Sequence, residues 1–219
     1  MLDMAGKPAV VIGGGSVALR KIKRLLTSGA SITVISPDIC SELCELWQTN
    51  TFTWKQKQFE AEDIADAFLI IAAANHKAVN RLVAAVTKPN QLLNVVDDPR
   101  AGNFHVPASL QRGKLTIAVG TDGASPHLAK NIRNQIGEQY GEEFIKYLQF
   151  LDTVRDFLLH CPSVSKTLKR ALLEETADLT YMKSIEKQQS LLLYLHLLSF
   201  TSEAEIEQSI LPSLIRIVK

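Results

Sequence analysis

A short apolar strand that leads directly into a glycine-rich turn and a helix is the feature that most restricts the fold of this chain. Residues 9–12 are continuously apolar, and the segment GGGSVA follows them as G-x-G-x-x-A. In this context Gly13 permits a tight turn, Gly15 lets a diphosphate approach the backbone, and Ala18 allows close packing of helix on strand. The helix start adds free N–H groups and a positive dipole end. The pattern predicts dinucleotide binding by Gly13, Gly14, Gly15, Ser16 and Val17; the alternative is a turn needed only for packing.

Short β-branched runs alternate with helical stretches over residues 8–120. A helix is predicted over Val17–Ser28, ended by Gly29, and another over Asn75–Thr87 with Asn75 as its N-cap. Runs such as FLIIAAA do not alternate with polar residues, which is typical of strands covered on both faces. We therefore expect an α/β fold with a doubly wound parallel sheet of the Rossmann type. The predicted strands are Ala9–Ile12, Ser31–Ile35, Thr51–Lys55, Phe68–Ala72, Leu92–Val95 and Leu115–Val119.

The remainder of the chain has a helical pattern. Pro126 suits the first turn of a helix, with Ser125 as its cap. Further along, an apolar stripe is expected at Leu148, Leu151, Val154, Leu158 and Leu159. The predicted organisation is a dinucleotide-binding domain over 1–112, a connecting segment over 113–145 and a helical domain over 146–219.

Composition limits the classes of partner and compartment. The chain has 219 residues, 46% of them hydrophobic, and its 24 Lys and Arg nearly balance its 23 Asp and Glu, so no excess of positive charge favours nucleic acid or an anionic membrane. The apolar run from Leu191 to Phe200 is shorter than the roughly 20 residues that a spanning helix needs. The start of the chain does not resemble a signal peptide, and the three cysteines match no zinc or redox motif. We expect a cytoplasmic protein with free thiols and without a nucleic-acid or membrane partner.

Several charged or polar side chains near the predicted strands are candidates for cofactor binding, for a solvated helix face or for a metal site. The second strand ends in Ser36-Pro37-Asp38, and Asp38 is placed to accept hydrogen bonds from the adenosine ribose and to repel a 2′-phosphate, which favours NAD over NADP. The alternative role of Asp38 is to cap the next helix. The basic run at residues 20–24 is expected to form a solvated helix face. No metal site is expected, because His105 and His127 have no partner at ligand spacing.

Three segments together resemble a known family. GGGSVALRKIKRLLTSGASITVISP, NVVDDP and IAVGTDGASPHLAKNIR occur in this order, and over about residues 1–145 the chain resembles precorrin-2 dehydrogenase, the dehydrogenase module of siroheme synthase. The resemblance implies oxidation of precorrin-2 to sirohydrochlorin with NAD⁺, on the way to siroheme or cobalamin. Some members also insert Fe²⁺ into the product. It further implies a homodimer, with residues 113–145 at the interface and a helical domain that closes over the substrate.

The resemblance also implies site residues. Asp97 takes the family's catalytic position; it follows a predicted strand, so it lies at the edge where such sheets bind ligands, and it would accept a proton. The alternative is that Asp97-Asp98-Pro99 is a turn whose acids cap backbone N–H groups. Ala74 would lie beside the nicotinamide where the family often has threonine, and Gly120 likewise lacks a family hydroxyl. The residues expected to contact the substrate, which bears many carboxylates, are Arg112, Lys114, Thr121 and Ser125; for each basic residue the alternative is a plain surface charge.

Two other functions remain open at this point. One is a dinucleotide-sensing regulatory module that signals through the helical tail and has no need of Asp97. The other is a dehydrogenase for a small polar substrate, against which the helices after the glycine loop offer no Tyr-x-x-x-Lys pair.

Overall fold

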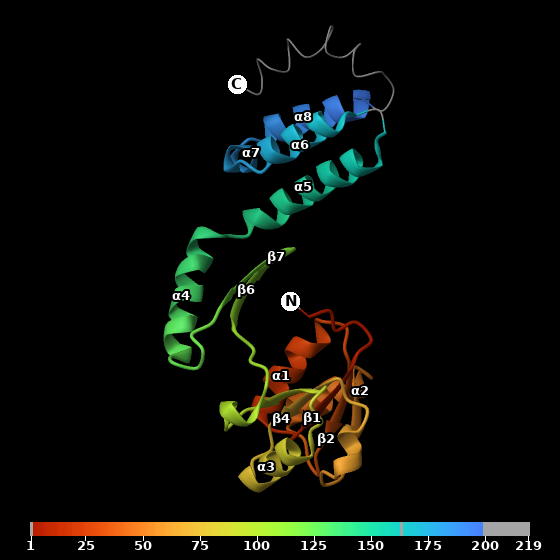
Figure 1. Cartoon of the computed structure of the whole chain (residues 1–219), viewed down its shortest axis with the longest axis vertical. Helices are drawn as coiled ribbons and strands as arrows, with labels where there is room; N and C mark the ends of the chain where they lie inside the picture. Colours follow the sequence, from red (N-terminus) through yellow and green to blue (C-terminus); the bar gives the residue numbers. More distant parts are fainter. Residues whose placement is uncertain (1, 163, 199–219) are drawn as a thin grey trace. The chain divides into compact units, whose positions relative to one another are not determined.

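The computed structural model describes residues 2–162 and 164–198, so the part of the predicted helical domain beyond residue 198 lies outside the described residues. The chain divides into two compact units, Met1–Val106 and Pro107–Lys219. Figure 1 follows the chain through both.

A parallel sheet forms the centre of the first unit. Its strand order is β3-β2-β1-β4-β5, and every neighbouring pair is parallel, which confirms the predicted doubly wound α/β fold. The strands are β1 (Pro8–Ile12), β2 (Ser31–Ile35), β3 (Thr53–Lys55), β4 (Leu69–Ala72) and β5 (Leu92–Val95). The helices are α1 (Ser16–Leu26), α2 (Ser41–Gln48) and α3 (Lys77–Val86), with 3-10 turns η1 (Ala61–Ile64) and η2 (Pro99–Ala101).

Helices cover both faces of this sheet, and this explains the uninterrupted apolar strands. Alternate residues of β1 point to opposite sides, so Val11 packs with Ile22 of α1 and Leu43 of α2, whereas Val10 packs with Val83 of α3. Figure 1 shows α1 and α3 on opposite sides of the strands. Each side of the sheet therefore has its own buried core.

Helix ends in this unit differ in detail from the prediction. Gly29 has a φ of +72°, as expected for a glycine just beyond a helix end. The predicted N-cap of α3 is wrong, because the helix begins at Lys77 and His76 occupies the N-cap position. Asn75 therefore belongs to the loop between β4 and α3.

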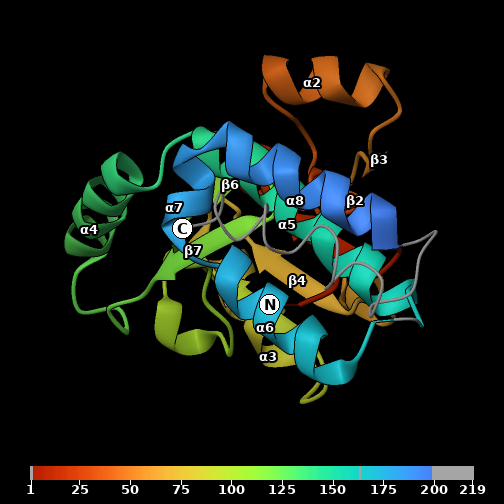
Figure 2. The same ribbon diagram turned by 90° about the horizontal axis from the view of Figure 1, so that it is seen from above.

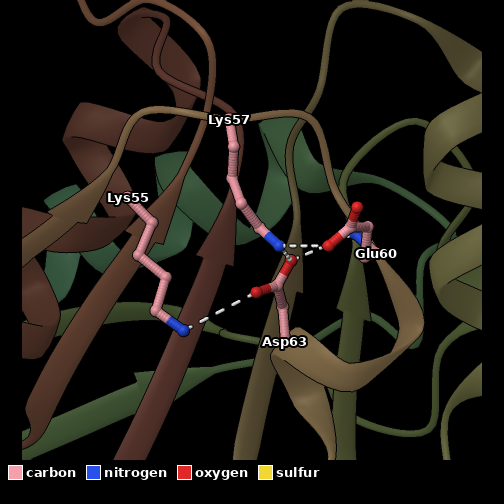
Figure 3. Close-up of polar contacts among 4 residues, drawn as sticks. All are labelled: Lys55, Lys57, Glu60 and Asp63. Atoms are coloured by element: carbon pink, nitrogen blue, oxygen red, sulfur yellow. Dashed lines mark hydrogen bonds and ion pairs between the residues drawn. The ribbon is translucent and has the colours of Figure 1, made fainter.

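A charged cluster fixes the connection between β3 and η1 (Figure 3). The Asp63 carboxylate, whose side chain is only 4% exposed, pairs with the ammonium groups of Lys55 at 3.6 Å and Lys57 at 3.2 Å. Lys57 also pairs with Glu60, and the Glu60 N–H donates to Asp63 at 3.0 Å. These contacts hold β3 at the edge of the sheet beside β2.

The second unit begins with an antiparallel hairpin and one helix across it. Strand β7 (Leu115–Val119) was predicted, but its partner β6 (Ala108–Arg112) was not. Gly113, with a φ of +54°, begins the two-residue turn between them, which is where a hairpin turn of this type takes glycine. Helix α4 (Pro126–Gln139) packs on the hairpin, and the predicted cap is confirmed, because Ser125 Oγ accepts from the Leu128 N–H at 3.2 Å.

The later residues of the second unit that the structure describes form four helices: α5 (Glu143–His160), α6 (Lys166–Thr176), α7 (Leu179–Lys183) and α8 (Ile185–Leu198). Figure 1 shows α6 and α8 on the same side of α5, whereas the view in Figure 2 shows them flanking it, and residues of all three helices share one buried core. The expected stripe on α5 is partly wrong: Tyr147, Phe150, Val154 and Leu158 are buried, whereas Leu159 is 63% exposed. In the described part of the chain, helices long and apolar enough for a bilayer span are absent.

Candidate functional site

The predicted residues of the first unit follow neighbouring strands at one edge of the sheet. The order of strands in the sheet changes direction between β1 and β4, which makes this position the topological switch point. Open α/β sheets bind ligands there, outside the carboxyl ends of the strands. The glycine turn follows β1, Ser36-Pro37-Asp38 follows β2, Ala74 lies just after β4 and Asp97 just after β5. The sequence thus brings all four segments to the same edge.

The first two glycines are needed where loops approach one another closely. A Cβ on Gly13 would lie 2.3 Å from the Ala73 carbonyl oxygen, and the residue has a φ of +119°. A Cβ on Gly14 would lie 2.1 Å from the Asp38 carbonyl oxygen, and the Gly14 carbonyl accepts from the Cys40 N–H at 2.8 Å. These two residues lock the turn against the loops after β4 and β2, so both positions require glycine.

The third glycine faces open space instead. The nearest atom that a Cβ on Gly15 would meet is Asn75 Oδ1, at 3.7 Å. Gly15 is also the N-cap of α1, and it has no side chain to occupy the N–H groups of the first turn. The first turn contains no acidic residue. This free, positively polarised helix start fits the diphosphate of a dinucleotide.

The loop after β2 is fixed by its own hydrogen bonds. The buried Ser36 hydroxyl donates to the Asp38 carbonyl at 2.6 Å, and Trp54 Nε1 donates to the Ser36 carbonyl at 2.9 Å. Asp38 is exposed, and the alternative in which it caps α2 is wrong, since Cys40 occupies that N-cap position. The Asp38 carboxylate is therefore left to face solvent or a ligand.

Asp97 is exposed and is held by a buried amide. Its Oδ1 accepts a hydrogen bond of 2.8 Å from Nδ2 of Asn80, which is 1% exposed on α3. The same amide bonds both the N–H and the carbonyl of Ala74, at 3.0 Å each. Asp98, by contrast, caps η2 by accepting from the Arg100 N–H at 3.2 Å. The capping role considered for both acids is confirmed for Asp98 alone.

A cavity of about 130 Å³ opens beside Asp97. Asn80, Lys77 and Arg81 of α3 line it together with Asp97 and Asp98. These three residues of α3 were not predicted from the sequence as site residues. Asn80 had a usable signal, because it lies three residues before the buried Val83 and so interrupts the apolar face of the helix with a polar group.

One member of the basic run on α1 is not solvated as expected. Lys21 is partly buried, and its ammonium donates to Asn94 Oδ1 of β5 at 2.9 Å. Burial, with Arg20 and Arg24 nearby, lowers the pKa of Lys21. Asn94 Nδ2 in turn donates to the Phe104 carbonyl at 3.0 Å, so the pair anchors the segment that follows η2.

The four residues expected to contact substrate lie in the second unit. Arg112 pairs with Glu142 at 3.4 Å and Lys114 with Asp152 at 2.5 Å. The Thr121 hydroxyl donates to the Ser125 carbonyl at 3.0 Å, and Ser125 caps α4. All four side chains thus have partners within their own unit.

Comparison with known proteins agrees with the two parts of this architecture. Residues 1–108 match a family described as putative NAD(P)-binding, and residues 112–139 match the central region of sirohaem biosynthesis proteins. The first match supports a nicotinamide dinucleotide as the ligand of the glycine turn. The comparison does not distinguish NAD from NADP.

Whole-chain relatives extend the similarity. A precorrin-2 dehydrogenase of Priestia megaterium is 40% identical over 192 residues, which cover 88% of this chain and 95% of that protein. One from Bacillus subtilis is 35% identical over 70% of this chain and 95% of its own length. A solved structure of SirC, a precorrin-2 dehydrogenase, superposes with a TM-score of 0.82 at 38% identity, covering 90% of this chain and 97% of SirC.

Proposed function

The chain belongs to the precorrin-2 dehydrogenase family, and we propose that it oxidises precorrin-2 to sirohydrochlorin with NAD⁺ in siroheme synthesis. The observation that carries the proposal is the pairing of two features at one sheet edge. The backbone at Gly15 is open to a diphosphate, and the carboxylate of Asp97 is tied through Asn80 to Ala74, the residue expected beside the nicotinamide. A sensing module would need the first feature alone.

The reaction removes one hydride and one proton from precorrin-2. Bound NAD⁺ supplies the hydride acceptor, so that one precorrin-2 and one NAD⁺ give sirohydrochlorin, NADH and H⁺. The chain must then orient the ring and accept the proton. Asp97 is the acid that we assign to this step, because its carboxylate is accessible and its position is fixed by a hydrogen bond.

Two features support NAD over NADP. We propose that Asp38 accepts hydrogen bonds from the adenosine ribose, where its negative charge would repel a 2′-phosphate. Lys55 ends the strand paired with β2, but Lys55 and the nearby Lys57 are already paired with Asp63 and Glu60 (Figure 3). These two lysines beside the end of β2 are therefore engaged, and they would compensate a 2′-phosphate only weakly.

Substrate recognition and assembly are assigned by extension from the family. We propose that Arg112, Lys114, Thr121 and Ser125 meet the carboxylates of the ring, and that residues 113–145 form the interface of a homodimer whose helical domain, 146–219, closes over the substrate. None of the three cysteines, all of which lie in the described part of the chain, forms a disulfide, as a reducing cytoplasm permits.

An anaerobic assay with precorrin-2 and NAD⁺ tests the proposal. Formation of sirohydrochlorin and NADH is followed by absorbance, with NADP⁺ in a parallel reaction. We expect turnover by the wild type, a strong preference for NAD⁺, and loss of the rate in Asp97→Ala with NAD⁺ binding retained. Asp98→Ala is the matched control, because it removes the neighbouring carboxylate and leaves Asn80 and Asp97 paired.

The possible outcomes separate the alternatives. A fully active Asp97→Ala enzyme would remove Asp97 from the mechanism. NAD⁺ binding without turnover by the wild type would favour the sensing module. Supplying Fe²⁺ with sirohydrochlorin in a further reaction decides whether the protein also inserts the metal.

A further inference from the structure

We propose that Asn80 is a positioning residue that holds the Asp97 carboxylate in a fixed orientation beside the loop after β4. The inference rests on the proposed role of Asp97 as the proton acceptor. It adds a residue of α3 to the working parts of the site.

The amide of Asn80 is fully committed, and its orientation follows from its partners. Oδ1 accepts from the Ala74 N–H at 3.0 Å, while Nδ2 donates to the Ala74 carbonyl at 3.0 Å and to Asp97 Oδ1 at 2.8 Å. The reversed amide would set two donors against each other at the Ala74 N–H and two acceptors at the Ala74 carbonyl. The N–H groups must therefore point to the Ala74 carbonyl and to Asp97.

Burial makes the loss of any of these three hydrogen bonds costly. Asn80 is 1% exposed, so no bulk water replaces a partner that it loses. The amide N–H and the carboxylate oxygen form a charge-assisted hydrogen bond, which fixes the orientation of the carboxylate. The accessible remainder of the carboxylate stays free to receive a proton from substrate.

The same side chain joins the two loops that border the reaction. Ala74 follows β4 and Asp97 follows β5, and these strands are neighbours in the sheet. A single amide therefore sets the spacing between the loop expected beside the nicotinamide and the acid expected beside the substrate. Misplacement of a reacting group by about 1 Å costs on the order of 100-fold in rate.

Two substitutions separate the possible roles of Asn80. Asn80→Asp keeps an acceptor for the Ala74 N–H but replaces the donor to Asp97 with a second carboxylate. Asn80→Ala removes all three bonds. Asn80→Asp also loses the donor to the Ala74 carbonyl, so if Asn80 only anchors the loop, both variants should lose activity while the pH profile of kcat keeps its wild-type position. If it positions Asp97, both lose about tenfold or more in kcat, and Asn80→Asp moves the acidic limb of the pH profile of kcat upward by roughly one unit or more.

A second buried amide in the same unit provides a matched control. Gln91, 3% exposed, donates to the Ile64 and Ala67 carbonyls and accepts from the Lys88 N–H. It precedes β5, whereas Asp97 follows β5, so it lies at the opposite end of the strand. Gln91→Glu should cost stability in the same way as Asn80→Asp and leave the pH profile of kcat at its wild-type position.

The measurements are the pH profiles of kcat and KM and the thermal unfolding of each variant of the full chain. Should Asn80→Asp not fold, Asn80→Ser removes the reach to Asp97 and gives the same test. A wild-type pH profile in the Asn80 variants, with Asp97→Ala inactive, overturns this inference and leaves the proposed function intact. An active Asp97→Ala enzyme instead means that the role of Asp97 itself is wrong.

Discussion

Replacing Gly15 with alanine tests whether the glycine turn binds a diphosphate or only packs. The new Cβ would have ordinary contact with Asn75 Oδ1 at 3.7 Å, and the backbone there, with φ −88° and ψ −173°, accepts any residue. Alanine is a poorer N-cap than glycine by up to about 1 kcal/mol, but it lowers the entropy of the unfolded chain by an amount worth about 0.4–1 kcal/mol. We expect these terms to cancel, so the unliganded variant should unfold near the wild-type temperature.

Binding of the dinucleotide should respond very differently. The methyl group would occupy the space through which the diphosphate approaches the first-turn amides, and each hydrogen bond to a charged group that is lost costs about 1.5–3 kcal/mol. Since about 1.4 kcal/mol is a factor of ten in affinity, the dissociation constant for NAD⁺ should rise by roughly 10- to 100-fold. Fluorescence titration with NAD⁺ measures it, alongside thermal unfolding without ligand.

Gly14→Ala is the contrasting variant. Its Cβ would lie 2.1 Å from the Asp38 carbonyl, so the loop after β2 must move, at a cost of about 1–3 kcal/mol in the free energy of unfolding. Wild-type NAD⁺ affinity in Gly15→Ala would show that no diphosphate rests on this turn. A large fall in its unfolding temperature without ligand would show that the third glycine also serves packing.

Two further predictions concern stability. Asp63→Ala should lower the free energy of unfolding by about 1–3 kcal/mol, because it leaves Lys55, Lys57 and the Glu60 N–H without their shared acceptor. Urea unfolding measures this change. A loss of stability no greater than that of the exposed control Asp66→Ala would contradict the prediction. Burial, with Glu175 beside it, raises the pKa of Tyr181, and burial raises that of Tyr147. The unfolded chain loses these protons near pH 10 while the folded chain keeps them, so stability present below about pH 10 should decline above it. Thermal unfolding followed by circular dichroism should show this decline, and Tyr181→Phe should reduce it; an equal decline in the variant would assign it to other groups.

Local patterns were sufficient for the first unit. The central strands β1 and β4 are continuous apolar runs, and their length and β-branched residues distinguish them from a helix without knowledge of their neighbours. The glycine turn was equally predictable, because the strand, the turn and α1 are contiguous in the sequence. The sequence does not show, however, that the two glycines differ. Only the structure shows that the loop after β2 packs against Gly14, whereas Gly15 is left open.

Sequence patterns did not predict contacts between residues that are far apart along the chain. The helical period placed Lys21 on a polar face, but its long side chain reaches Asn94 on β5, and no local signal encodes that distance. The hairpin partner β6 was missed because the run Ala108–Arg112 is short and mostly polar, and its pairing with β7 stabilises it more than its own propensity does.

The sequence by itself determined the parallel sheet, the glycine turn and the carboxylate that follows β5, since each depends on residues adjacent along the chain. Only the tertiary structure decided what holds that acid. Asn80 lies 17 residues before Asp97, and the two meet because α3 packs beside β4 and β5. A buried amide must find partners for all its polar groups, and the fold alone determines which groups are within its reach.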